Sequence, residues 1–404
     1  MNRWQSPPKV SRLGAIVLGC MIALSACFIA PPQPSTHSNP ECVQEYRANV
    51  DYFPNKVRLT DAEGFTVTYH QHYKVVSVNR PWKDAKTQFQ YVLVQCGTPI
   101  PSGFKPEQIV QIPVRSVVAL STTHFVPLER LNVLDRLVGI SNFKDVTTPS
   151  VIEKIEANQL VEVGDSGNLN VERVLELSPE LVTTYGTGNP QQDSHPKLLE
   201  AGLKVAIVAE YMESTPLGRA EWIKFLATFF NREAEAEQRF AEVRQRYQAI
   251  AAKTTNRQTK PTVFSGSDFN GTWYVSGGKS YVAQFFQDAG ATYLWADEHT
   301  PGSLQLNFEQ VYDRAIAAQY WIVNATDVKT RKDLLAADPR YQDFAALQSG
   351  KVFSPTAKVN PDGGNDYWQS GTANPDLILA DLVKIFHPEL MPQHQFVYYR
   401  QLSP

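Results

Sequence analysis

The chain has 404 residues, of which 43% are hydrophobic and 20% are charged, and its formal net charge is −3. A chain of this length and composition can bury at least two hydrophobic cores, so we expect a folded protein with more than one lobe. Charges of both signs are interleaved, which argues against a nucleic-acid partner because phosphate binding needs a concentrated basic surface.

The N-terminus has the pattern of an export signal. Basic residues precede an apolar run from Leu13 to Leu24, and Leu24 begins the motif Leu-Ser-Ala-Cys, which ends at Cys27. A basic region, a short apolar region and small residues before the cleavage point are typical of a secretory signal peptide. Leu-Ser-Ala-Cys also resembles the bacterial lipobox, in which the cysteine is diacylated and becomes the mature N-terminus.

We therefore expect residues 1–27 to be a lipoprotein signal peptide with Cys27 as the lipidation site. The protein would be exported and lipid-anchored to the bacterial membrane, facing the periplasm or the cell exterior. An ordinary signal peptide or a single membrane anchor is the alternative, although the apolar run is short for a membrane span.

The next segments predict a tether and a small sheet. Residues 28–40 are rich in proline, serine and other polar residues without periodicity, as in flexible tethers. Apolar and polar residues then alternate in short runs, which predicts a small antiparallel sheet within a β extension over residues 41–112. These runs are Val57–Thr60, Phe65–Tyr69, Tyr73–Val78 and Gln90–Val94.

With Cys20 in the expected signal peptide and Cys27 as the expected lipid site, two cysteines are left, Cys42 and Cys96. Because an exported protein is not kept reduced by the cytosol, we expect these two cysteines to form a disulfide that closes the small sheet.

Strands and helices alternate from Ser116 onward. Parallel pairing through right-handed crossovers is the usual result, so residues 113–213 are predicted to form an α/β lobe. The predicted strands are 117–120, 137–140, 180–185 and 205–208, and the predicted helices are 123–131, the stretch after Asn170, and 198–201.

Between Gly218 and Lys253 apolar residues recur at helical spacing, which predicts one long amphipathic helix within an inter-lobe segment, residues 214–259. Strands at 262–265, 320–324 and 351–353 and a helix at 281–289 then predict a second α/β lobe over residues 260–404. The expected fold class is α/β, with two α/β lobes containing parallel sheets joined by one long helix, plus the small N-terminal β extension.

One phrase occurs in both lobes. Leu-Asn-Val-Glu-Arg-Val-Leu begins at Leu169, and Leu-Asn-Phe-Glu-Gln-Val-Tyr begins at Leu306. Each phrase precedes a predicted strand and places one glutamate, Glu172 or Glu309, at a helix start. The repeat indicates two related lobes. Acidic residues are also common at helix starts because the helix dipole favours them there.

Two α/β lobes with this repeat, a long connecting helix and an export signal resemble the substrate-binding proteins of ABC importers for ferric siderophores and vitamin B12. The resemblance covers roughly residues 113–390. Its strongest pieces are Val118–Thr123, Val161–Val174 running into Leu177–Val182, Tyr274–Tyr281, Tyr367 with Trp368, and Asp381–Leu390.

The resemblance implies a monomeric solute-binding lipoprotein that is not an enzyme and has no cofactor. Its ligand would be a ferric siderophore or a related metal chelate, and its partner an ABC permease dimer in the membrane. Glu172 and Glu309 match the one glutamate per lobe that pairs with permease arginines, a geometry that carboxylate and guanidinium groups favour.

The ligand is expected in the cleft between the lobes, outside the carboxyl ends of the strands. Aromatic side chains there suit a bulky planar or catecholate ligand. The absence of an obvious arginine pair, which some relatives use for anionic ferric complexes, leaves the ligand charge open. The candidate ligand-binding residues are Ser121, Thr122, Thr123, His124, Asn142, Phe143, Tyr185, Asp268, Trp273, Tyr274, Ser303, Asp366, Tyr367 and Trp368.

Three alternatives stay open. The protein could be a cobalamin or haem carrier, or a secreted hydrolase or metal-dependent enzyme, although no base, nucleophile or metal set converges in the sequence. A metal-ion binding protein with direct histidine and carboxylate ligands is the third, although we expect no direct metal ligand. Its histidine candidates are His70, His72, His124, His195 and His299.

Overall fold

The computed structural model describes residues 41–404. The predicted signal peptide, the lipidation site Cys27 and the tether lie outside the described residues. Within residues 41–404, no helix is both long enough and apolar enough to cross a membrane.

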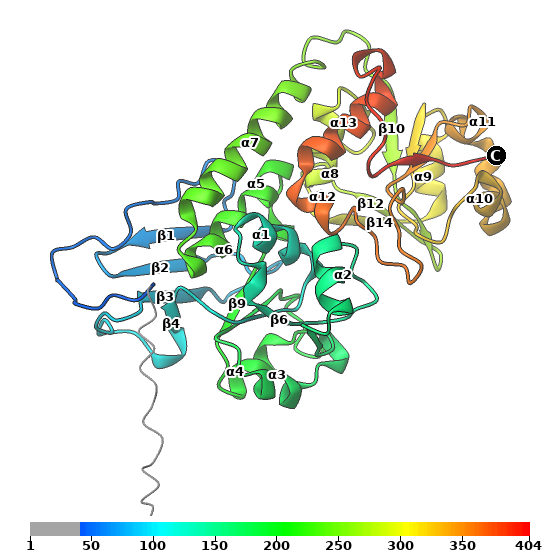
Figure 1. Cartoon of the computed structure of the whole chain (residues 1–404). Coiled ribbons are helices and arrows are strands. Elements are labelled where there is room, and N and C mark those ends of the chain that lie inside the picture. Colours follow the sequence, from blue (N-terminus) through cyan, green and yellow to red (C-terminus); the bar gives the residue numbers. More distant parts are fainter. Residues whose placement is uncertain (1–40) are drawn as a thin grey trace, which may run out of the picture. The chain divides into compact units, whose positions relative to one another are not determined.

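The N-terminal extension is a four-stranded sheet with the order β1-β2-β3-β4, drawn in blue and cyan in Figure 1. β1, β2 and β3 coincide with predicted runs and pair antiparallel, whereas β4 pairs parallel with β3. The run Val57–Thr60 is not a strand, which corrects the prediction. The strands are β1 (Phe65–Tyr69), β2 (Tyr73–Val78), β3 (Phe89–Gln95) and β4 (Ile109–Ile112).

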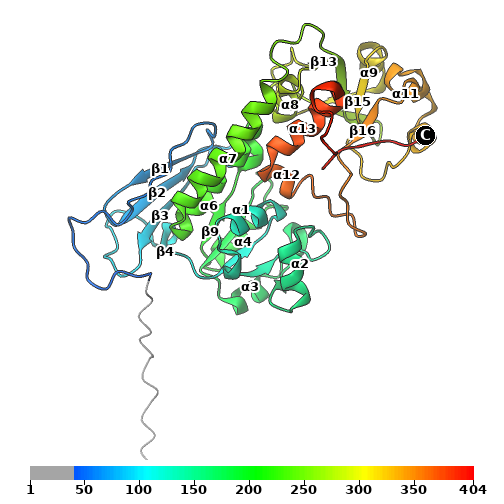
Figure 2. The same cartoon turned by 45° about the horizontal axis from the view of Figure 1, so that its top comes forward.

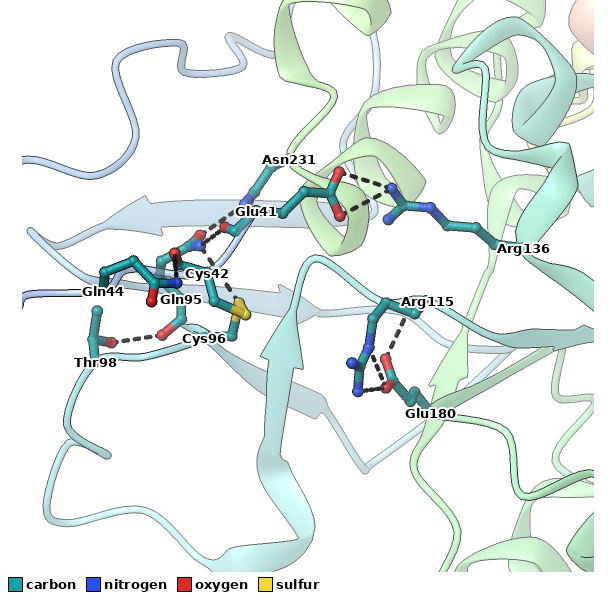
Figure 3. Close-up of a disulfide and its surroundings, with 10 residues drawn as sticks. All are labelled: Glu41, Cys42, Gln44, Gln95, Cys96, Thr98, Arg115, Arg136, Glu180 and Asn231. Atoms are coloured by element: carbon teal, nitrogen blue, oxygen red, sulfur yellow. Dashed lines mark hydrogen bonds and ion pairs between the residues drawn. A yellow bond between two sulfur atoms is a disulfide. The ribbon is translucent and has the colours of Figure 1, made fainter. Parts of the chain in front are cut away.

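Cys42 and Cys96 are joined by a disulfide, as predicted from the sequence. Figure 3 shows the bond beside the end of β3, where the Val43 N–H donates to the Cys96 carbonyl at 2.9 Å. An ion pair of 3.0 Å between Glu41 and Arg136 also ties this segment to the first lobe. The disulfide thus fixes the start of the described chain against the sheet.

The first lobe contains a five-stranded parallel sheet with the order β7-β6-β5-β8-β9. Its central strand is fully buried, because Val117, Val118 and Ala119 have no exposed surface. A strand buried on both faces is expected to be continuously apolar. The strands are β5 (Val117–Ala119), β6 (Leu137–Ile140), β7 (Val161–Glu162), β8 (Leu181–Thr184) and β9 (Val205–Ile207). The helices are α1 (Phe125–Arg130), α2 (Pro149–Glu156), α3 (Val171–Leu177) and α4 (His195–Glu200).

The second lobe has a five-stranded sheet with the order β13-β10-β15-β16-β17, parallel except for β17. A separate antiparallel sheet, β11-β12-β14, was not predicted. The strands are β10 (Thr262–Ser265), β11 (Ser267–Phe269), β12 (Thr272–Ser276), β13 (Thr292–Tyr293), β14 (Ser303–Leu306), β15 (Tyr320–Ile322), β16 (Val352–Ser354) and β17 (Arg400–Gln401). The helices are α8 (Tyr281–Asp288), α9 (Phe308–Ala315), α10 (Arg331–Ala337), α11 (Ala345–Gln348), α12 (Ser370–Ala373) and α13 (Pro375–Phe386).

The two-lobed α/β fold class is therefore confirmed, but the segment between the lobes is not one continuous helix. It forms α5 (Pro216–Glu221), α6 (Ile223–Phe230) and α7 (Glu233–Ala251). α6 ends at Phe230, because the next residue, Asn231, has a left-handed φ of 55° that cannot continue an α-helix. α7 runs beside α13 of the second lobe, as both Figure 1 and Figure 2 show.

All eight residues of α6 are buried, because α6 lies under the β extension. The ring of Phe65 on β1 lies 5.5 Å from Phe225, and the ring of Tyr91 on β3 lies 5.8 Å from Phe229. An apolar helix that is buried on every side belongs to a core. The extension therefore shares one hydrophobic core with the first lobe.

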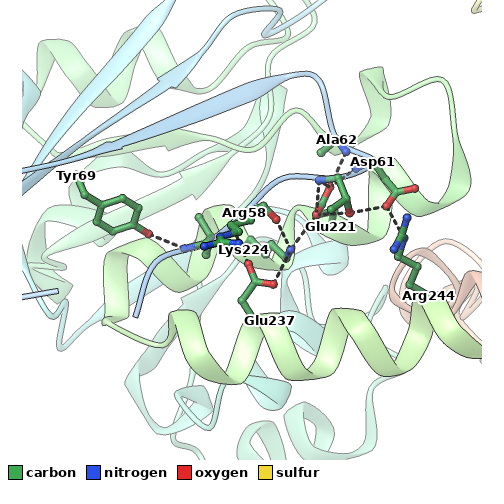
Figure 4. A network of polar contacts seen from close by, with 10 residues as sticks. Arg58, Asp61, Ala62, Tyr69, Glu221, Lys224, Glu237 and Arg244 are labelled. Atoms are coloured by element: carbon green, nitrogen blue, oxygen red, sulfur yellow. Dashed lines mark hydrogen bonds and ion pairs between the residues drawn. The ribbon is translucent and has the colours of Figure 1, made fainter. Parts of the chain in front are cut away.

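A buried carboxylate fastens the extension to this helical segment (Figure 4). Glu221 has no exposed surface and accepts hydrogen bonds from the backbone N–H groups of Thr60, Asp61 and Ala62 at 2.7–3.1 Å. Its charge is balanced by Lys224 at 2.9 Å, which is also buried. These bonds occupy the backbone of Thr60 and explain why the alternating run before β1 is not a strand.

Replacing Glu221 by alanine is expected to lower the free energy of unfolding by about 3 kcal/mol, because removal of one partner leaves a buried charge and backbone donors uncompensated. Urea denaturation followed by circular dichroism would measure the change. Glu242→Ala on α7 removes a carboxylate that is 42% exposed and paired with Arg239, and it should cost less than about 0.5 kcal/mol. Equal stability of the two variants would contradict the role of Glu221.

Candidate functional site

A cleft of about 290 Å³ lies between the two lobes. From the first lobe it is lined by residues that follow β5, β6, β7 and β8, at the carboxyl ends of the parallel strands. From the second lobe it is lined mainly by the loop after β16. The lining residues are Leu120, Ser121, Thr122, Ser141, Asp145, Asp165, Tyr185, Thr326, Gly363, Gly364, Asn365, Trp368 and Gln369.

Two aromatic side chains face the cleft from opposite lobes. Tyr185 follows β8 in the first lobe, Trp368 follows β16 in the second, and each is 37% exposed. Aromatic rings usually bury their surface, so half-exposed rings that line a cavity are suited to contact a ligand.

Ser121 and Thr122 form the polar wall after β5. The Ser121 side chain caps the short helical turn that follows, accepting from the Thr123 N–H at 3.4 Å. It also lies 2.9 Å from the Thr123 hydroxyl. This local capping fixes the loop that the sequence places at the strand end.

The two lobes are hydrogen-bonded to each other at one side of the cleft. Asn360 Nδ2 donates to the carbonyls of Lys144 and Val146 at 2.7 and 3.1 Å. The Thr147 hydroxyl donates to Asp366 at 2.9 Å. We call these bonds, together with those described next for Gln369, the inter-lobe latch.

Gln369 completes the latch. Its Oε1 accepts from the Thr147 N–H at 2.9 Å, and its Nε2 donates to the Asp145 carbonyl. Gly364 lies against the same carbonyl, since a Cβ there would stand only 2.4 Å from the Asp145 oxygen. The latch therefore requires a glycine at this point and holds the loop that carries Trp368 against the first lobe.

The cleft is acidic. Asp145 and Asp165 both line it, and no lysine, arginine or histidine is among its lining residues in the described chain. Burial raises the pKa of Asp145, and the neighbouring carboxylates of Asp165 and Glu162 raise it further. A positive charge placed beside these carboxylates would be stabilised.

The structure brings together four of the predicted ligand-binding residues, namely Ser121, Thr122, Tyr185 and Trp368. Thr123 and His124 instead line a separate small pocket of about 30 Å³, which Glu210 and Arg219 also line. His124 is buried, with Nδ1 2.9 Å from the Thr183 hydroxyl, and burial lowers its pKa to about 3, so it is neutral. These two residues contribute to the packing behind the cleft.

Trp273 was predicted to bind the ligand, but this prediction is wrong, because the Trp273 side chain has no exposed surface. Its indole lies 5.6 Å from the ring of Trp321 and donates to the Ser265 carbonyl at 3.3 Å, inside the core of the second lobe. Tyr367 is likewise 5% exposed, and its ring stands edge-on to Trp368 at 4.8 Å. It supports Trp368 from behind and does not line the cleft.

The remaining predicted residues do not line the cleft either. Asp366 belongs to the latch, Asn142 accepts from the Lys144 N–H at 2.9 Å, and Phe143 packs against the core. Asp268, Tyr274 and Ser303 lie on the separate sheet β11-β12-β14.

Several lining residues were not predicted. Asp165 follows β7, a strand of only two residues whose sequence gives little periodic signal. Asp145 lies close to the predicted Phe143, and Gln369 directly follows the predicted Trp368. The sequence signal that could have identified both residues is their position in a loop after a parallel strand.

Glu172 and Glu309 occupy matching positions in the two lobes. Glu172 is exposed in the first turn of α3, where Asn170 caps the helix, and Glu309 is exposed in the first turn of α9, where Asn307 does the same. Glu309 also lies 3.4 Å from Arg340. The repeated phrase is therefore a pair of capped helix starts, each presenting one carboxylate to solvent.

In residues 41–404 no group of three histidine, cysteine, aspartate or glutamate side chains converges to hold a metal ion. His70 and His72 lie between β1 and β2, where His70 stacks on Tyr73 at 4.2 Å and His72 packs edge-on to Tyr46.

Comparisons with known proteins agree with this architecture. An uncharacterized lipoprotein of Methanocaldococcus jannaschii is 29% identical over 74% of this chain and 73% of its own length. A possible iron-binding, periplasmic solute-binding protein of Staphylococcus epidermidis has a similar structure, with a TM-score of 0.54 and 17% identity over 68% of this chain and 98% of that one. A periplasmic vitamin B12-binding protein of Vibrio cholerae also has a similar structure, with a TM-score of 0.50 and 18% identity over 70% of this chain and 99% of that one.

The model of the periplasmic binding protein family matches residues 117–359, which is more than half of the chain and covers the strands of the first lobe and much of the second lobe. The chain therefore belongs to the periplasmic binding protein family, as its sequence predicts.

Proposed function

We propose that this protein is an extracytoplasmic, lipid-anchored solute-binding protein of an ABC importer. It captures a ferric siderophore or a similar metal chelate in the cleft and delivers it to the permease. The observation that carries the proposal is the cleft itself, which lies at the carboxyl ends of parallel strands and has one half-exposed aromatic ring from each lobe. The family match and the lipoprotein named among the relatives support the cellular setting.

The acidic side chains of the cleft restrict the charge of the ligand that it can bind. Asp145 and Asp165 repel a strongly anionic complex such as a ferric tris-catecholate, and they would also disfavour the two carboxylates of haem. A neutral or cationic chelate, such as a ferric trihydroxamate or cobalamin, is compatible with two carboxylates and two aromatic rings. We infer that the ligand carries no net negative charge.

The size of the cleft bears on how a ligand enters. A volume of about 290 Å³ holds only part of a siderophore or corrinoid, so the ligand must protrude from the cleft or the lobes must separate. Separation requires the inter-lobe latch to open. α7, a rod of 19 residues beside α13, restricts that motion to a small one.

Isothermal titration calorimetry should show that the ferric complex of a linear trihydroxamate bearing a free amine, which is cationic, or cobalamin, binds more tightly than a ferric tris-catecholate. Trp368→Ala should weaken binding of the preferred compound about tenfold, because it removes an aromatic contact. Phe269→Ala is the matched control, because Phe269 is an aromatic residue that is 67% exposed on β11 and does not line the cleft.

The doubly neutralised variant Asp145→Asn with Asp165→Asn should raise the relative affinity for the anionic complex. Tight binding of the tris-catecholate by the wild type would contradict the inferred charge, and a wild type that binds no member of the panel would contradict the proposed function.

Asn360→Ala should loosen the latch, because two hydrogen bonds to the first lobe disappear. Small-angle scattering of the ligand-free variant is expected to show a larger radius of gyration than the wild type. Asp362→Ala is the control from the same loop. A large compaction of the wild type on ligand addition would show that the latch does not hold the lobes together.

Reversing both helix-start charges, Glu172→Arg with Glu309→Arg, should abolish uptake while leaving ligand affinity unchanged, because each lobe loses its carboxylate for permease arginines. Uptake of the radiolabelled chelate by cells would be compared with titration of the purified protein. Glu176→Arg with Asp313→Arg makes the same charge change on α3 and α9 away from the helix starts and should transport normally. Normal uptake by the first variant would exclude these glutamates as docking residues.

A further inference from the structure

The loop that carries Tyr185 is packed against the N-terminal extension. Trp82 lies in the segment between β2 and β3, and its indole is pressed against the backbone of Gly186 and Gly188. A Cβ would stand 2.6 Å from the indole at Gly186 and 2.7 Å at Gly188, so neither position accepts a side chain while Trp82 is in place. Gly188 also has a left-handed φ of 80°, which favours glycine.

Trp82 lies at the centre of a packed interface between the extension and the loop after β8. The ring of His195 lies 5.4 Å from the indole, and the ring of Phe89 on β3 lies 5.8 Å from it. The Tyr211 hydroxyl donates to the Gly186 carbonyl and lies 3.2 Å from the Pro81 carbonyl. The extension and the loop are thus joined by both packing and polar contacts.

The loop beyond Tyr185 is held in shape by Asp193. Its buried carboxylate accepts from the Thr187 N–H at 2.6 Å, the Thr187 hydroxyl at 2.8 Å and the Gly188 N–H at 3.0 Å. Residues 187–192 are exposed, so these bonds and the face formed by Trp82 determine the path of the loop.

We propose that Trp82 is a positioning residue for the ligand cleft, which holds the loop after β8 so that Tyr185 faces the ligand. This inference rests on the proposed function. The Tyr185 ring is half exposed, so its position depends on the backbone that precedes and follows it. A loop fixed before binding costs less ordering entropy when the ligand arrives.

Trp82 lies outside the segment that the family model matches, which begins at residue 117. The vitamin B12-binding protein of Vibrio cholerae aligns over 99% of its own length but only 70% of this chain. The extension is therefore an addition to the two-lobed core, and through Trp82 it contributes to the ligand site from outside that core.

Hydrogen exchange of the ligand-free protein tests the positioning role without a ligand. In Trp82→Ala, the peptide containing Thr187 and Gly188 should exchange faster than in the wild type, because the loop loses its packing surface. Phe104→Ala is the matched control, because Phe104 is a half-buried aromatic residue of the same extension whose ring contacts Tyr73. Unchanged exchange in Trp82→Ala, or the same acceleration in Phe104→Ala, would overturn the proposal.

A double-mutant cycle tests the link to binding, with the ferric trihydroxamate or cobalamin as the titrant in calorimetry. Trp82→Ala should weaken binding about tenfold in the wild-type background and less than about twofold in Tyr185→Ala, because the two residues act as one unit. Trp82→Phe should restore part of the affinity. Equal losses in both backgrounds would overturn the proposal.

A wild type that binds neither compound would overturn the proposed function instead. The exchange experiment would still decide whether Trp82 holds the loop.

Discussion

A parallel sheet brings the carboxyl ends of its strands to one edge, and the candidate site depends on this constraint. In the first lobe the loops after β5, β6, β7 and β8 supply Ser121, Asp145, Asp165 and Tyr185 to one wall. In the second lobe the loop after β16 supplies Trp368. Residues that are far apart in the sequence become neighbours because their strands are parallel. The inter-lobe latch then joins the two edges, so the chemistry of the cleft and the contact between the lobes come from the same loops.

The same constraint explains which parts of the site could be predicted from the sequence. Ser121 and Tyr185 follow well-marked strands, and their placement required only the strand boundaries and the rule for open α/β sheets. Trp273 and Tyr274 are adjacent on β12, and neighbouring residues of a strand point to opposite faces. Only one of these two side chains can face solvent. Which one does so depends on how β12 pairs in the sheet β11-β12-β14, and this sheet was not predicted.

Other features depended on tertiary contacts that no local pattern encodes. The break between α6 and α7 requires a left-handed Asn231, while the apolar spacing on both sides is that of a continuous helix. The latch uses backbone carbonyls of residues 144–146, and carbonyl positions carry no sequence signal. The alternation at 57–60 predicted a strand, but the buried carboxylate of Glu221 binds this backbone instead.

The bond between Thr60 and Glu221 joins residues that are 161 positions apart. A chain made from its N-terminus therefore produces the extension long before it produces the helices that the extension packs on. Until α6 is made, the apolar face of the small sheet has no partner, and Phe65 and Tyr91 remain open to solvent or to other chains. The extension is the first described part of the molecule to be synthesised, yet it cannot complete its core until more than half of the chain has been made.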